Sequence, residues 1–221
     1  GGGGTDALRL ASRAPYWFAG VINRSGSVGP DGDVLYANLA KTPVAYVNGA
    51  TEESGADLAP LNALGAAVIE EAGSAYAPSP ETLSALGEWF GARQRDVVPT
   101  ELDFLIDDII YQSCYWLKAA RINRRATATP SDADFPRLKG RVDRAGNKIS
   151  VETTSVYDGI WVYLSDALVD MDKPVVIEVN GKERHNKVVR RSMQDMLENR
   201  FYNNSGDCGI YTGLVYIDEL E

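Results

Sequence analysis

Imidazole and thiol side chains are scarce in this sequence, whose 221 residues include one histidine, His185, and two cysteines, Cys114 and Cys208. A site built from several histidines is therefore excluded. The cysteines show no Cys-x-x-Cys spacing, so they form neither a thiolate zinc site nor a framework of disulfides. The two cysteines are therefore expected to be buried thiols or to form one disulfide with each other. We expect no metal centre and no cofactor.

Basic side chains are fewer than acidic ones, and long apolar runs are absent. The 31 acidic side chains outnumber the 22 basic ones, which gives a net charge of −9. Because an acidic surface repels phosphate backbones, nucleic acid is not expected as a partner. No apolar run reaches the roughly 18 residues of a membrane-spanning helix, so no transmembrane segment is expected. The chain starts at Gly1 without a methionine, so we expect its native start to be missing or processed, and its localisation stays open.

The first part of the chain, residues 1–96, alternates between extended and helical patterns. Apolar runs ended by Gly or Asn-Gly indicate strands, and apolar residues at helical spacing indicate helices. Ser79 and Pro80 suit the N-cap and first turn of one helix. Strands that alternate with helices are typical of a parallel sheet covered by helices, the α/β class. The strands are expected at 19–26 and 42–49, and the helices at 5–19, 56–72 and 80–92.

The second part, residues 97–221, contains short strands at close spacing. Asn180-Gly181 predicts a type I′ turn between two of them, because both residues tolerate positive φ. A small antiparallel β-sandwich with one helix is therefore expected, so the fold class is α/β plus all-β. The strands are expected at 101–106, 113–121, 138–142, 147–153, 159–164, 174–179 and 213–218. The helix is expected at 192–201, with an apolar face made of Met193, Met196, Leu197 and Phe201.

Several segments together resemble a known family. The opening GGGGTDALRLASRAPYWFAGVINRSG is similar to the stretch after the nucleophile elbow of α/β-hydrolases of the prolyl-oligopeptidase-like and dienelactone-hydrolase-like kinds. TPVAYVNGATEE (42–53) resembles the next core strand, and residues 87–104 resemble the closing helix. Residues 151–218 resemble the accessory β-sandwich of some bacterial members. The resemblance implies the C-terminal part of a serine hydrolase domain, with a partial sheet in 1–96 and the sandwich in 97–221.

This resemblance also implies where catalytic residues belong. Gly1 and Gly2 would lie in the nucleophile elbow beside the oxyanion hole, with the serine upstream of Gly1 and outside the chain. Glu52 would take the place of the acid, and Asn48 stands where many relatives carry histidine. The base belongs in 70–80, where Ser74, Ala75 and Tyr76 occupy the expected position, and none of these accepts a proton near neutral pH. The nucleophile and general base are therefore both absent, and enzyme status stays open.

Three functions follow from these observations. The first is a catalytically inactive, hydrolase-derived binding or assembly component, because a partial sheet requires a partner: the N-terminal half of the hydrolase domain or another protein chain. The second is an active serine esterase or peptidase with its nucleophile upstream of Gly1. The third is a carbohydrate or cell-surface binding module. The aromatic residues that could stack on a sugar are Tyr111, Tyr115, Trp116, Trp161 and Tyr163.

Overall fold

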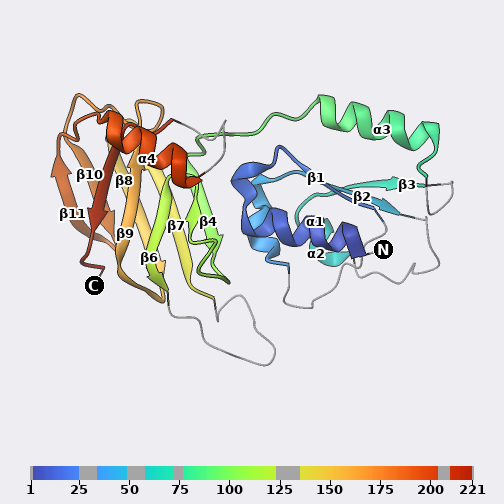
Figure 1. Ribbon diagram of the computed structural model, residues 1–221, viewed down its shortest axis with the longest axis horizontal. Coiled ribbons are helices and arrows are strands. Elements are labelled where there is room, and N and C mark those ends of the chain that lie inside the picture. The colour runs from blue at the N-terminus through green and yellow to red at the C-terminus, as the bar shows by residue number, and fades with distance from the viewer. Residues whose placement is uncertain are drawn as a thin grey trace. The chain divides into compact units, whose positions relative to one another are not determined.

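The computed structural model describes residues 2–24, 34–48, 58–71, 77–122, 135–203 and 210–220. The chain divides into two compact units, Gly1–Asp96 and Val97–Glu221 (Figure 1). Its secondary structure is mixed, with 26% helix and 38% strand in several sheets. This content agrees with the expectation of an α/β part together with a β part.

The first unit contains a three-stranded parallel sheet. Its order is β1-β2-β3, and both neighbouring pairs run parallel. Helices cover it on both sides, with α1 and α2 on one side and α3 on the other (Figure 1). The strands are β1 (Val21–Arg24), β2 (Val44–Asn48) and β3 (Ala67–Glu70). The helices are α1 (Gly2–Arg13), η1 (Pro15–Trp17), η2 (Tyr36–Lys41), α2 (Ala59–Ala63) and α3 (Pro80–Gly91).

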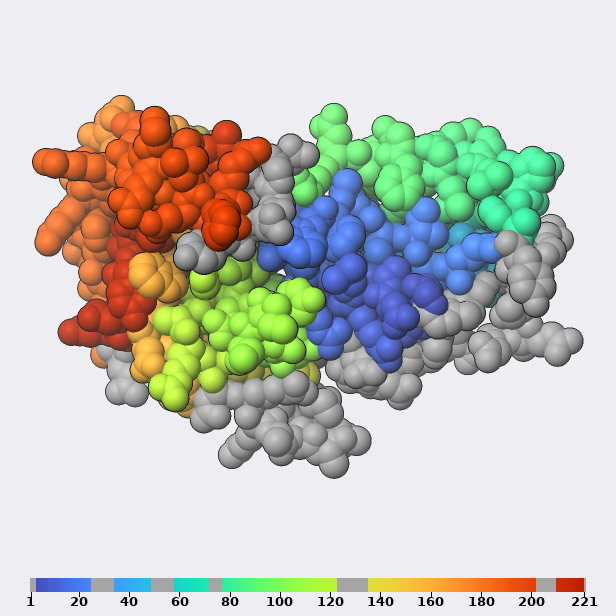
Figure 2. All heavy atoms as spheres, viewed as in Figure 1, coloured from blue at the N-terminus to red at the C-terminus, as the bar shows by residue number. Residues whose placement is uncertain are grey.

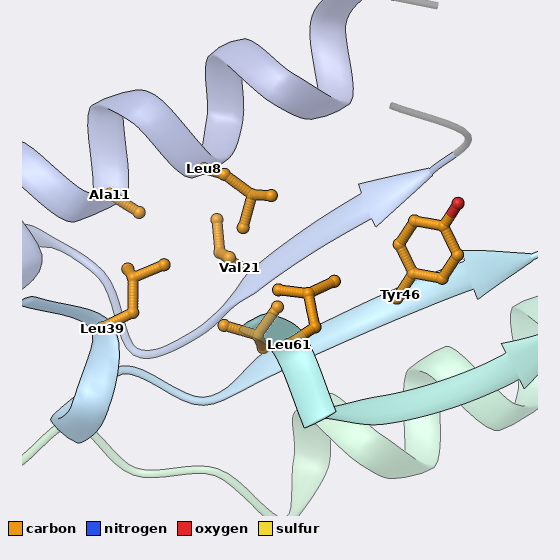
Figure 3. Close-up of a cluster of buried hydrophobic side chains, with 7 residues drawn as sticks. Leu8, Ala11, Val21, Leu39, Tyr46 and Leu61 are labelled. Atoms are coloured by element: carbon orange, nitrogen blue, oxygen red, sulfur yellow. The ribbon is translucent and has the colours of Figure 1, made fainter. Parts of the chain in front are cut away.

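One hydrophobic cluster joins the helices of this unit to its sheet. Leu8 and Ala11 lie one turn apart on α1, so they share a face, and both are fully buried. They pack against the strands from one side, together with residues of η2 and α2 (Figure 3). The cluster consists of Leu8, Ala11, Val21, Leu39, Val44, Tyr46 and Leu61.

The predicted helix at 56–72 is wrong in its second half. Within the described residues, α2 is short, and Gly65 follows it with a φ of +67°, a left-handed conformation that ends the helix without steric cost. The chain then forms β3, whose Val68 and Ile69 pair in parallel with Tyr46 and Val47 of β2. Tertiary pairing of β-branched residues therefore overrides the helical spacing. The helix predicted at 80–92 is confirmed, and the Ser79 hydroxyl accepts the Thr82 N–H at 3.1 Å.

Within its described residues, the second unit contains two sheets. One has five strands in the order β11-β10-β8-β7-β4, and the other has four in the order β12-β9-β6-β5. The first five strands of this unit are β4 (Glu101–Leu105), β5 (Ser113–Cys114), β6 (Leu117–Ile122), β7 (Arg137–Asp143) and β8 (Lys148–Thr154). The others are β9 (Val156–Leu164), β10 (Val175–Val179), β11 (Lys182–Lys187) and β12 (Gly213–Ile217).

Two details of this unit differ from the expectation. The strand predicted at 113–121 is divided into β5 and β6 by a turn in which Tyr115 has a φ of 51°. One strand pair, β10 with β8, is parallel, although the other pairs are antiparallel. The parallel pair arises because the chain leaves β8 for β9 in the other sheet and returns to pair beside β8. The turn at Asn180-Gly181 is confirmed, with φ values of 50° and 78° between β10 and β11.

Helix α4 (Met193–Asn203) forms where the sequence predicts it, and three residues of its apolar face are exposed, while Met196 is half-buried. Met193, Leu197 and Phe201 are 74%, 56% and 78% exposed. Most of the apolar face that the sequence shows on this helix is therefore exposed in the structure. Figure 2 shows α4, in orange-red, on the outside of the second unit.

An ion-pair network joins the start of the α4 segment to the loop after β9. The guanidinium of Arg191 donates to both carboxylate oxygens of Asp166, at 3.0 and 2.5 Å, and to Asp172 at 2.6 Å. These hydrogen bonds from Arg191 lower the pKa of Asp166 below its ordinary value of 3.8. A lowered carboxyl pKa stabilises the fold above the ordinary value, and this contribution is lost as the pH falls through the lowered pKa.

We therefore expect Arg191→Gln to weaken the acid dependence of stability. Between pH 7 and pH 3, the free energy of unfolding of the wild type should fall more than that of the variant, because only the wild type holds Asp166 ionised by this contact. Urea unfolding of both proteins at a series of pH values measures the difference. Two curves that stay parallel below pH 4 would contradict the prediction.

Candidate functional site

The three strands of the first unit end together at one edge of their sheet. Because β1, β2 and β3 are parallel, their last residues, Arg24, Asn48 and Glu70, lie at the same edge. We name this the carboxyl edge, and it includes Glu71, which follows β3 directly. In open α/β sheets, ligands bind outside the carboxyl ends of the strands. The carboxyl edge is therefore the candidate functional site of this unit.

Asn48 and Glu70 are bonded across the ends of β2 and β3. They are direct partners in the strand register, and the Asn48 amide donates to both Glu70 oxygens, at 3.3 and 3.2 Å. Burial, with a smaller effect from the negative charge of Glu70, raises the pKa of the Tyr46 hydroxyl. This hydroxyl therefore remains protonated at neutral pH. An amide and a protonated phenol can position a ligand, but neither is a general base.

Glu71 is a buried carboxylate at the carboxyl edge. Its side chain is fully buried, and Oε1 accepts the N–H of Ser79, the N-cap residue of α3, at 3.1 Å. The Arg24 guanidinium lies 3.9 Å from Oε2. The backbone N–H of Glu71 donates to the carbonyl of Asn48 at 2.7 Å. Glu71 therefore connects the ends of β1 and β2 to the start of α3, where a negative charge is also favoured by the helix dipole.

We expect Glu71→Ala to reduce the free energy of unfolding of the first unit by about 2 kcal/mol, the range for a hydrogen bond that involves a charged group. Glu70→Ala is the matched control, because Glu70 is the neighbouring glutamate and is exposed. The control should change stability by less than about 1 kcal/mol. Urea unfolding measures both variants. If both variants lost the same free energy of unfolding, burial of the Glu71 carboxylate would contribute nothing specific to stability.

Of the sequence-predicted catalytic positions, the structure describes Gly2. Gly2 is the first residue of α1. Gly1, Glu52 and the segment 74–76, where the base is expected, lie outside the described residues. Glu71 is a buried site residue that the sequence did not reveal. The only signal for it is a pair of glutamates that follows an apolar run, and this does not tell which of the two is buried.

The only histidine of the chain is in the second unit. His185 lies on β11, which is at the end of the five-stranded sheet. Its Nε2 is 3.2 Å from the carbonyl oxygen of Lys187 on the same strand. Burial lowers the pKa of the imidazole, with a smaller opposite effect from this hydrogen bond. His185 is thus part of the hairpin that follows Asn180-Gly181, as its position in the sequence indicates.

The five aromatic residues proposed for sugar stacking do not form one surface. Tyr115 and Trp116 belong to the core of the second unit, where the Trp116 indole N–H donates to the Pro99 carbonyl at 2.7 Å. Trp161 and Tyr163 instead lie on the other face of β9 from the fully buried Ile160 and Val162, with Trp161 half-buried and Tyr163 buried. The surface is therefore smaller than the sequence suggests, and it is formed by these two residues with their neighbours on β6 and β12.

Carboxylates in the second unit also have structural partners. Asp103 makes a two-pronged ion pair with Arg137 on the neighbouring strand, with both distances 2.5 Å. Asp108 accepts the backbone N–H of Ile110 at 2.9 Å and so stabilises a turn. Among the described residues, no three His, Cys, Asp or Glu side chains are grouped so that they could hold a metal ion.

Comparison with known proteins assigns the chain to no family. No family model matches the chain, and neither a curated protein nor a solved structure matches it. Over the described ranges, no helix combines the length and the apolar character needed to cross a bilayer.

Proposed function

We propose that this chain is a catalytically inactive component derived from an α/β-hydrolase, and that another polypeptide segment completes its sheet. The observation that carries the proposal is the position of β1. Among the described residues, β1 is at the end of the sheet order and pairs only with β2. An edge strand presents unpaired N–H and C=O groups that can pair with a further strand, so β1 offers a place where another segment could extend the sheet.

The backbone of β1 supports the same reading. The Val21 N–H donates to the Pro43 carbonyl at 2.9 Å, toward β2. Successive backbone amides of a strand point to opposite sides, so the Ile22 N–H points to the open side. Moreover, α1 packs on β1 and precedes it, which is the place of a crossover helix between two parallel strands. A strand that precedes α1 would therefore pair beside β1.

The lack of a base supports an inactive component. Serine hydrolases need a nucleophile activated by a proton acceptor, usually histidine. The whole sequence has one histidine, and it lies on β11 of the second unit. On the described carboxyl edge, Glu71 is held by Ser79 and Arg24, and Asn48 is held by Glu70. General acid–base catalysis contributes about 100- to 10,000-fold, so its loss would remove useful turnover.

Purification from the native source, followed by intact mass measurement, tests the partner. The expected result is that residues 1–221 occur within a longer chain or in a stable complex with a second polypeptide. In that material, the Ile22 amide should exchange with solvent at least 100-fold more slowly than in the isolated 221-residue chain. Equal exchange rates in the two samples would refute the pairing of β1.

Ile22→Pro is the most selective variant for this test. Proline removes the N–H on the open side of β1 and leaves the bonds to β2 intact, so the isolated chain should remain folded. Association with the completing segment should weaken at least tenfold. Asn23→Pro is the matched control, because its N–H points toward β2 and its loss should destabilise the isolated chain itself.

Activity is tested separately on the native material. A fluorophosphonate probe should not label it, and p-nitrophenyl acetate should not be hydrolysed above the rate of a heat-denatured sample. Labelling together with turnover would favour the active esterase or peptidase and would overturn the inactive reading, even if β1 proved to be paired.

A further inference from the structure

The side of α4 that lines the cavity carries polar residues, and the most buried residue of the helix is the polar Asn199. Asp195, Glu198 and Asn199 are spaced i, i+3 and i+4, so they share one face of the helix. Asn199 is only 5% exposed, whereas Met193 and Leu197 are on the exposed side. Helices on a protein surface normally direct their apolar side to the core, and buried polar groups are the more informative exception.

The sheet beneath α4 contributes two aromatic rings and one cation. Trp161 and Tyr163 are two residues apart on β9, so their side chains are on the same face. In the strand register, Trp161 is directly opposite Lys118 of β6 on one side and Tyr216 of β12 on the other. The Trp161 and Tyr216 rings lie 4.3 Å apart at 37°. This packing fixes the orientation of the Trp161 indole.

A cavity of about 240 Å³ lies between these two layers. We call it the α4 pocket. Pockets for drug-sized ligands have roughly 300–1,000 Å³, so the α4 pocket suits a smaller ligand, such as a single sugar ring. The residues that line it are Lys118, Trp161, Tyr163, Asp195, Glu198, Asn199 and Leu214.

The buried side-chain amide of Asn199 is evidence that the α4 pocket holds a ligand. Its Nδ2 has no hydrogen-bond partner within the part of the chain that the structure describes. A buried donor without an acceptor is unfavourable, and buried polar groups in proteins nearly always have partners. An acceptor on a bound molecule would satisfy this amide. The position of Asn199 is set by α4, which is anchored where the Ser192 N–H donates to the Thr212 carbonyl at 2.6 Å.

The other polar groups supply both acceptors and donors. Glu198 receives one hydrogen bond, from the Gln194 amide at 2.8 Å on its Oε1, and the Asp195 carboxylate lies one turn before it. Burial, with a smaller effect from the Glu198 charge, raises the pKa of Tyr163 to about 12, so its hydroxyl stays protonated. Lys118 and Asn199 provide further N–H donors.

We propose that the α4 pocket binds one ring of a neutral carbohydrate. Sugar hydroxyls donate to carboxylates and accept from amide and ammonium groups, so one ligand can satisfy both kinds of group. The apolar face of a sugar ring would pack on Trp161. Two carboxylates beside one lysine disfavour an anionic ligand. This site is independent of the carboxyl edge and of β1, so its test does not depend on the proposed function.

Binding is tested on the complete chain with a glycan array and then with free sugars in solution. Titration with methyl glycosides of glucose, galactose, mannose and N-acetylglucosamine, followed by tryptophan fluorescence and calorimetry, should give saturable binding of at least one of them. Tetramethylammonium is included because two carboxylates and an indole also suit a cationic ligand. Saturable binding of tetramethylammonium in place of every sugar would overturn the proposal, as would no binding of any glycan.

Two variants link binding to the pocket. Asn199→Ala should weaken sugar affinity at least fivefold without lowering the unfolding temperature, because the amide donor has no partner in the described structure. Trp161→Phe should weaken affinity at least fivefold as well. Asn186→Ala is the matched control, since this exposed amide donates to Glu183 on the other sheet and its loss should leave affinity unchanged. Sugar binding that survives both pocket variants would place it elsewhere and refute the proposal.

Discussion

Gly140→Ala is expected to reduce the free energy of unfolding of the second unit by about 3 kcal/mol, the upper part of the usual range for overpacking a core. Gly140 lies on β7 and faces the Trp116 side chain beside β6. A Cβ atom built at Gly140 would clash with Cη2 of the Trp116 ring and lie 2.8 Å from Leu117 Cδ1. Trp116 and Leu117 are both fully buried, so they have no free space into which to move.

The Trp116 ring is also held at its other end. Its indole N–H donates to the Pro99 carbonyl at 2.7 Å, so moving the ring away from a new methyl group would break a buried hydrogen bond. Gly140 is therefore required for close approach of the two sheets rather than for a special backbone angle. In the double variant Gly140→Ala, Trp116→Phe, the smaller ring should relieve the clash, so the two losses should be clearly less than additive.

Gly87→Ala is the control for this chemical change. Gly87 lies within α3, and a Cβ atom there would contact nothing within 4 Å. Alanine is favoured over glycine inside a helix by roughly 0.5–1 kcal/mol, so the control should be neutral or slightly stabilising. Urea unfolding followed by tryptophan fluorescence measures both variants. If Gly140→Ala changed the free energy of unfolding no more than the control, this result would contradict the packing of Trp116 against β7.

Leu8→Ala is expected to destabilise the first unit by about 3 kcal/mol. Leu8 is fully buried in the cluster that joins α1 to the sheet, and removing a buried leucine leaves a cavity as well as losing the transfer free energy. The expected loss is a large fraction of the stability of a small domain, which is about 5–15 kcal/mol. Amides of β2 should then exchange markedly faster with solvent, because they depend on the same cluster.

Leu10→Ala provides the same chemical change on the same helix. Leu10 is 42% exposed, so its truncation removes less buried surface and should cost less than about 1 kcal/mol. Hydrogen exchange followed by mass spectrometry assigns the effect to a unit, since amides of β8 belong to the other compact unit. Equal destabilisation by the two leucine variants would contradict the position of α1 on the sheet.

Local signals predicted several elements because their causes lie within a few residues. Ser79 caps α3 through its own hydroxyl, and Asn180-Gly181 forms a turn because both residues tolerate positive φ. β3 was missed for the opposite reason. Its residues have helical spacing with the preceding stretch, and they become a strand through pairing with β2, which is about twenty residues earlier in the chain.

The candidate sites depended even more on distant contacts. Glu70 and Glu71 are adjacent and chemically identical, yet one is exposed and the other is buried against Ser79 and Arg24. The α4 pocket brings Lys118, Trp161 and Asn199 together from three elements. The sequence of α4 shows an apolar face, but the structure buries Asn199 and leaves Met193, Leu197 and Phe201 exposed.

The amino-acid sequence by itself determined the chemical limits of this protein: one imidazole, no multi-cysteine metal spacing, a net charge of −9, and turns and caps that short segments specify. Only the tertiary structure decided that β1 is an edge strand among the described residues, which glutamate is buried, and which face of α4 lines a cavity. The physical reason is that composition and turn geometry are local properties. Burial and strand partners instead depend on which distant segments supply the competing surface.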